Sequence, residues 1–145
     1  MQDDYQKVFP RMLEADRLIF ATPVFFMTVC AQGKLLIDRC QCLWSRKYVL
    51  KEPIFRTDSR DRRGMVIAVG GSKSKKMFDG IRLPMQYYFD VLDVRCAAHL
   101  FVNQVDAKGD VLRHPTAMGE ARRLGRELVL ATGPPPKEPL EVTLF

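Results

Sequence analysis

The chain lacks the features that mark a membrane protein or a small secreted one. Among its 145 residues, no apolar run approaches the roughly 20 residues that a membrane-spanning helix requires. The beginning, MQDDYQK, resembles no signal peptide. With four cysteines and 47% hydrophobic residues, we expect reduced thiols rather than the disulfide set of a secreted scaffold. These absences predict a cytoplasmic protein without a membrane partner, and the length predicts one core-forming domain.

A compact metal-binding motif is also absent. Cys40 and Cys42 fall two residues apart on an expected helix, where such neighbours face different directions, so we expect no metal site there. Of the two histidines, His99 falls in the middle of an expected strand. We interpret it as a core histidine whose polar groups are satisfied.

The net charge of +6 is concentrated in one segment. Residues 45–64 contain seven basic residues against three acidic ones. Such a segment could bind nucleic acid or another acidic surface, but basic loops are usually solvated, and only Tyr48 and Phe55 are available to stack on bases. We expect a crossover loop here, and nucleic acid is not an expected partner.

The stretch of residues 17–44 organises the rest of the chain. Leu18 begins a continuous apolar run of four residues, the pattern of a strand that is buried on both faces of a parallel sheet. Pro23 is expected to end this strand. Apolar residues at helical spacing then predict one helix from Thr28, a plausible N-cap, to Trp44. The turn between them, residues 22–27, lies where open α/β sheets bind ligands.

The same plan repeats along the chain. Residues 64–69 and 95–102 predict two further buried strands, each preceded by a helix, and residues 115–130 predict a last helix. This alternation predicts an α/β fold with three neighbouring parallel strands and helices on both faces. Residues 1–132 would form the domain, and residues 133–145 a Pro-rich linker with a tail that alternates as an edge strand does.

Four stretches resemble a known family. The runs LEADRLIFATPVFFMTVCAQGKLLIDR, GMVIAVGGSK, FDVLDV and HPTAMGEARRLG are similar to the NADPH-dependent FMN reductases, especially their iron-sulfur flavoprotein branch. The resemblance covers residues 1 to about 130. It implies a flavodoxin-like three-layer sandwich in which the three predicted strands match the third, fourth and fifth strands of the family.

The resemblance also implies a site and a function. In the family, the loops after the third and fourth strands hold the flavin ring, and here these are residues 22–27 and 70–73. The implied FMN-binding residues are Thr22, Pro23, Val24, Phe25, Phe26, Gly70, Gly71, Ser72 and Lys73. Apolar side chains beside free backbone groups suit a flavin ring, which carries out the redox chemistry itself. The implied function is that of an FMN-binding, NAD(P)H-dependent oxidoreductase. No acid–base side chain is expected to be catalytic.

The chain departs from the family before its first matching residues. Relatives begin with a strand, a phosphate-binding loop, a helix and a second strand, and the iron-sulfur branch adds a cysteine motif; none has a counterpart here. We therefore expect an N-terminally truncated domain with weak FMN binding and no iron-sulfur cluster. The edge of the strand beginning at Arg17 would then be open, covered by a second copy in a homodimer, by another chain, or by the tail at residues 140–145.

Two alternatives stay open at this point. Phe25 and Phe26 could be core or dimer contacts, in which case the chain is a non-catalytic interaction module without bound flavin. Lys73, Lys75 and Lys76 could meet the 2′-phosphate of NADPH or form a solvated loop. Flavin absorbance of the purified protein would separate the enzyme from the interaction module.

Overall fold

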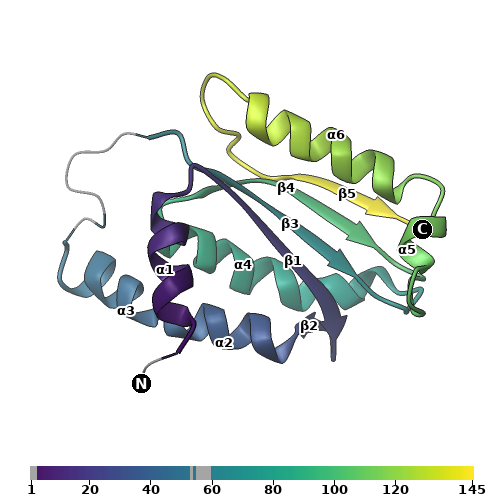
Figure 1. The fold of residues 1–145 in the computed structure, drawn as a ribbon, viewed down its shortest axis with the longest axis horizontal. Helices are drawn as coiled ribbons and strands as arrows, with labels where there is room; N and C mark the ends of the chain where they lie inside the picture. Colours follow the sequence, from purple (N-terminus) through teal and green to yellow (C-terminus); the bar gives the residue numbers. More distant parts are fainter. Residues whose placement is uncertain (1–2, 53, 55–59) are drawn as a thin grey trace.

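A computed structural model describes residues 3–52, 54 and 60–145, and its centre is a five-stranded sheet (Figure 1). The elements in chain order are α1 (Tyr5–Glu14), β1 (Arg17–Phe25), β2 (Thr28–Val29), α2 (Ala31–Arg39), α3 (Gln41–Trp44), the π-helix η1 (Ser45–Val49), β3 (Arg63–Val69), the 3₁₀-helix η2 (Lys75–Phe78), α4 (Asp79–Val91), β4 (Arg95–Val102), α5 (Asp110–Arg113), α6 (Ala117–Leu130) and β5 (Leu140–Leu144). The strand order is β2-β1-β3-β4-β5. Among the described strands, β2 is antiparallel to its neighbour and the other four are parallel.

Helices cover both faces of the sheet, which confirms the three-layer α/β prediction (Figure 1). One core packs α1, α2 and α4 against the sheet and includes Met12, Ile81 and Phe101. The second core packs α6 against the opposite face and includes Leu100 and Leu124. None of the described helices is long and apolar enough to span a membrane.

The three predicted strands are parallel neighbours, as expected. Ala21 pairs with Ile67, and Ile67 pairs with Leu100. The sheet nevertheless has four parallel strands rather than three, because β5 pairs with β4. The idea that the tail covers the edge of β1 is therefore wrong: β5 lies at the opposite edge of the sheet.

β1 differs from the prediction in both length and burial. Leu18 and Phe20 pack on the α4 side, whereas Ile19 on the other face is 55% exposed. Pro23 does not end the strand. The Arg63 N–H donates to Asp16 O at 3.0 Å, which directs the backbone groups of residues 17, 19, 21 and 23 away from β3. Proline, which has no N–H to donate, is therefore tolerated on the side of β1 that faces away from β3.

The single helix predicted from Thr28 to Trp44 is also wrong. Thr28 and Val29 instead form β2, and Cys30 occupies the N-cap position of α2. The helical path is then divided into α2, α3 and η1. Thr28 pairs with Phe25 across a tight turn, so it belongs to a hairpin and cannot cap the helix.

Arg62 of the basic segment serves the fold. Arg62 is 4% exposed and donates to three backbone carbonyls. Nε bonds Ala15 O at 2.9 Å, Nη2 bonds Met12 O at 2.6 Å, and Nη1 bonds Leu92 O. These carbonyls lie in the last turn and at the C-caps of α1 and α4, where helices leave carbonyls without partners. One cation thus closes two helix ends.

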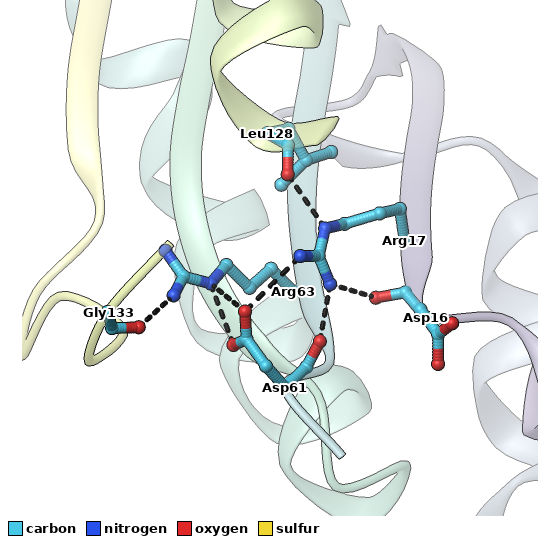
Figure 2. A network of polar contacts seen from close by, with 6 residues as sticks. All are labelled: Asp16, Arg17, Asp61, Arg63, Leu128 and Gly133. Atoms are coloured by element: carbon cyan, nitrogen blue, oxygen red, sulfur yellow. Dashed lines mark hydrogen bonds and ion pairs between the residues drawn. The ribbon is translucent and has the colours of Figure 1, made fainter. Parts of the chain in front are cut away.

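A second arginine network ties the amino end of the sheet to α6 (Figure 2). Arg17 Nε donates to Leu128 O at 2.7 Å, and Arg17 Nη1 donates to Asp61 O. Arg63 reaches both oxygens of Asp61 at 2.8 and 2.9 Å and donates to Gly133 O. Arg62 and Arg63 of the basic segment are therefore bonded within the chain and do not form a free basic surface. Of the two proposed stacking residues, Tyr48 is exposed and Phe55 lies outside the described residues.

His99 is a core histidine, as predicted, but its polar groups are not all satisfied. It is buried on β4, stacked on Phe101 with ring centroids 5.3 Å apart. Its Nδ1 lies 3.7 Å from Glu141 Oε2 and has no hydrogen-bond partner in the described chain. Glu141 instead accepts two bonds from Arg82, both at 2.8 Å. Burial lowers the pKa of His99, so the neutral imidazole is favoured.

Candidate functional site

A strained hairpin stands at the carboxyl end of β1. β1 and β2 are joined by Phe26 and Met27, whose φ angles are 50° and 65°. Two positive φ angles at the centre of a hairpin are the type I′ pattern, which Asn and Gly usually occupy. For larger residues this conformation stores strain, which is typical of functional sites. Phe26 is fully exposed (102%), and Phe25 and Met27 are also exposed. The hairpin therefore presents three apolar side chains to solvent.

The base of the hairpin is fixed by Thr22. Its side chain is buried, and its Oγ1 donates to Pro23 O at 2.8 Å and accepts from the Cys30 N–H at 3.1 Å. The sequence did not predict Cys30 as a residue of this site. The pKa of the Cys30 thiol is lowered, chiefly by a hydrogen bond from the backbone N–H of Gly33 and to a smaller extent by one with the Thr22 hydroxyl. Thr22 thus links β1 to the residue that follows β2 and holds the base of the hairpin together.

The glycine loop, residues 70–74, follows β3 and has its carbonyls turned inward. Gly70 O accepts from the Val105 N–H at 3.1 Å and Ser72 O from the Gln104 N–H at 3.4 Å. Lys73 O accepts from Asn103 Nδ2 at 3.2 Å. Each bond draws a carbonyl toward the segment that follows β4.

The same loop also contains N–H groups that are not used by the described part of the chain. The residues Gly71, Ser72 and Lys73 are exposed, and their N–H groups have no acceptor within residues 3–52, 54 and 60–145. A Cβ at position 71 would lie 2.7 Å from Asp106 Oδ1, so a side chain there would displace the exposed carboxylate of Asp106. The loop therefore offers a row of backbone donors to a ligand.

The hairpin and the glycine loop adjoin. Pro23 pairs with Val69 in the sheet, and a Cβ built on Gly70 would lie 3.2 Å from Val24 Cβ. β1, β3 and β4 all point toward this end of the sheet (Figure 1). The structure thus brings together both loops that the sequence selected. Apolar surface beside hydrogen-bond donors fits a flat ring with carbonyl oxygens.

Asn103 is the supporting residue that sequence reasoning missed. It is fully buried directly after β4, and its Oδ1 has no partner in the described part of the chain. The signal that could have found it is a polar residue at the carboxyl end of a buried strand. Its amide is the group that orients Lys73 O.

Other predicted residues lie outside this arrangement. Lys75 Nζ lies over the Phe145 ring, 4.2 Å from its centroid, and Lys76 is exposed. Cys40 is buried, which raises the pKa of its thiol to about 11, and Cys42 is exposed. No group of three or more metal-ligating side chains occurs among the described residues.

Comparison with known proteins identifies the family. Residues 1–83 match the family described as NADPH-dependent FMN reductase, and because this is more than half of the chain, the chain belongs to that family. It is 32% identical over 129 residues to YwqN of Bacillus subtilis, which is named as an NAD(P)H-dependent FMN-containing oxidoreductase. It is 37% identical over 73 residues to an iron-sulfur flavoprotein of Methanocaldococcus jannaschii.

The chain spans less than two thirds of the length of these curated relatives, 66% of one and 33% of the other. The Bacillus subtilis match covers 86% of this chain, and the iron-sulfur flavoprotein match covers 50% of it. A solved structure described as the Trp repressor binding protein from Bacillus subtilis superimposes with a TM-score of 0.64 at 30% identity. That superposition covers 86% of this chain and 71% of the other. The predicted family and its flavodoxin-like fold are confirmed.

Proposed function

We propose that this chain binds FMN between the hairpin and the glycine loop and functions as an NAD(P)H-dependent flavin oxidoreductase. The observation that carries the proposal is the row of free N–H groups on Gly71, Ser72 and Lys73 beside an exposed aromatic hairpin. Family membership supports the same ligand. We also propose that the protein is cytoplasmic, where its four unpaired thiols would stay reduced.

The residues divide the work of binding. Phe25 and Phe26 offer apolar surface to the flavin ring, and the glycine loop donates N–H groups to carbonyl oxygens on the ring edge. Thr22, Pro23 and Val24 hold the hairpin in place, and Gly70 lets it lie close to the loop. When bound, FMN supplies the hydride-accepting and hydride-donating chemistry. The chain's own task is to orient the ring.

The FMN affinity of the 145-residue chain is expected to be micromolar or weaker. In this proposal the three free N–H groups bind the ring and are therefore not available to the phosphate. Each charge-assisted hydrogen bond that the phosphate forgoes is worth roughly 1.5–3 kcal/mol. Titration of FMN into the apoprotein, followed by flavin fluorescence, measures the dissociation constant. Nanomolar binding by the monomer would contradict the assignment of these donors to the ring.

A pair of aromatic variants tests the site itself. Phe26→Ala should weaken FMN binding about tenfold, because an aromatic contact contributes about 0.5–1.5 kcal/mol beyond its area burial. Tyr87→Ala removes another exposed aromatic residue, on α4, and should leave the affinity unchanged. Absence of any spectral change when FMN is added to the wild-type protein would favour the alternative, an interaction module whose exposed hairpin contacts another protein.

We also propose a homodimer formed through the open edge of β1. β2 covers only Val24 and Phe25, and no other strand in the described ranges pairs with this side. Ile19 is exposed beside it, together with Ala21 and Pro23. Folded proteins ordinarily cover such an apolar edge, and a second copy related by a two-fold axis would extend the sheet.

Sedimentation of the purified chain measures this association. A dimer is expected at micromolar concentration, and Ile19→Lys should shift it to monomer by placing like charges at the two-fold contact. Leu35→Lys changes another exposed apolar residue, on α2, and should leave the dimer intact. A wild-type protein that stays monomeric, with fast amide exchange in β1, would exclude both a second copy and any other cover.

A further inference from the structure

Gly80 lies in the first turn of α4, directly against the hairpin. A Cβ built on Gly80 would lie 2.2 Å from Met27 O and 3.3 Å from Met27 C. The Thr28 Oγ1 donates to Gly80 O at 2.9 Å. The backbone of the hairpin therefore rests on the backbone of the helix, and no side chain fits between them.

This contact fixes the exposed tip of the hairpin. Met27 is one of only two residues in the turn, and both have positive φ angles. Because so short a turn has no spare residue to absorb a displacement, a shift of Met27 O would carry Phe26 with it. The tip can thus keep its place against α4 only while position 80 lacks a side chain.

Other glycines on helices show that this demand is local. A Cβ on Gly119 or Gly125 of α6 would meet nothing within 4 Å. Gly64 is also crowded, with a Cβ 2.6 Å from the Phe89 ring, but that contact lies within the buried core. Among the glycines described, Gly80 is the one whose missing side chain makes room for the backbone of the exposed hairpin.

We propose that Gly80 is a positioning residue of the flavin site. It sets how closely the hairpin approaches α4 and therefore where Phe25 and Phe26 stand relative to the donors of residues 71–73. The inference rests on the proposed FMN site. It adds that the affinity of this site is set by a backbone contact from a helix that does not itself touch the ring.

The test compares two glycine-to-alanine substitutions on helices. Gly80→Ala should weaken FMN binding at least tenfold and change the visible circular dichroism of the bound flavin, which reports the environment of the ring. Amide exchange in residues 26–29 should become faster while the unfolding transition stays cooperative. Gly125→Ala makes the same chemical change in open space and should alter neither the affinity nor the dichroism.

A second variant covers the case in which Gly80→Ala does not fold. Thr28→Val removes the hydroxyl bond to Gly80 O without adding bulk, and it should also weaken FMN binding and speed exchange in the hairpin. If the wild type binds FMN and both folded variants keep its affinity and dichroism, the positioning role is overturned while the FMN site stands. If the wild type binds no FMN, the proposed function and this inference fail together.

Discussion

We expect Arg62→Met to lower the free energy of unfolding by about 3–5 kcal/mol. Hydrogen bonds from a charged donor contribute roughly 1.5–3 kcal/mol each and do not add fully. The substitution removes bonds to Met12 O, Ala15 O and Leu92 O and leaves these carbonyls short of partners at two helix ends. Urea denaturation followed by far-ultraviolet circular dichroism measures the loss.

A matched variant separates burial from charge. Arg122→Met makes the same change at an exposed position on α6 and should alter the free energy of unfolding by less than about 0.5 kcal/mol. Equal effects of the two substitutions would show that Arg62 acts only through net charge, and the account of helix closure would then be wrong.

Phe101→Ala should cost about 3–5 kcal/mol, the usual range for deleting a buried aromatic ring. Phe101 is fully buried on β4 and stacks on Phe78 with centroids 4.5 Å apart and an interplanar angle of 5°. The Arg82 guanidinium lies 5.2 Å from the centre of its ring. Removing the ring would leave a cavity between the sheet and α4, and thermal or urea unfolding would report it.

Phe26→Ala is the control for this prediction. The same ring is removed at the fully exposed hairpin tip, so the free energy of unfolding should change by no more than about 0.5 kcal/mol. The two variants thus separate folding from binding: one should destabilise the protein, and the other should weaken FMN affinity in a stable protein. A large destabilisation by Phe26→Ala would place that side chain in the core instead.

The central strands were predictable because their burial is written in the local sequence. β3 and β4 are mostly apolar and lie inside the sheet. β1 has a similar apolar run, but it lies next to the short edge strand β2. A run of residues does not encode which strand will be central, since that depends on pairing between distant segments. For this reason the exposure of Ile19 and the tolerance of Pro23 could not be read from the sequence.

The candidate site was predictable to the level of its loops. The stretches 22–27 and 70–73 were identified, and the structure places Val24 of the first against Gly70 of the second. The hairpin was missed because Phe26 and Met27 are not residues that ordinarily form a type I′ turn, whereas the spacing from Val29 onward suits a helix. The roles of Asn103 and Gly80 depend on contacts between elements far apart in the chain, which no local pattern contains.

The place of Pro23 on β1 limits how any neighbouring strand could pair. Pro23 has no N–H to donate at the free edge, and β2 already pairs with Val24 and Phe25 after it. A full ladder of hydrogen bonds is therefore available from Arg17 to Ala21. Antiparallel pairing of two such segments is centred on Ile19, which would face its own copy with Cα atoms about 5.5 Å apart. That separation lies within the range of a disulfide. An Ile19→Cys dimer should therefore cross-link spontaneously under oxidising conditions, and failure to do so would exclude this symmetry axis.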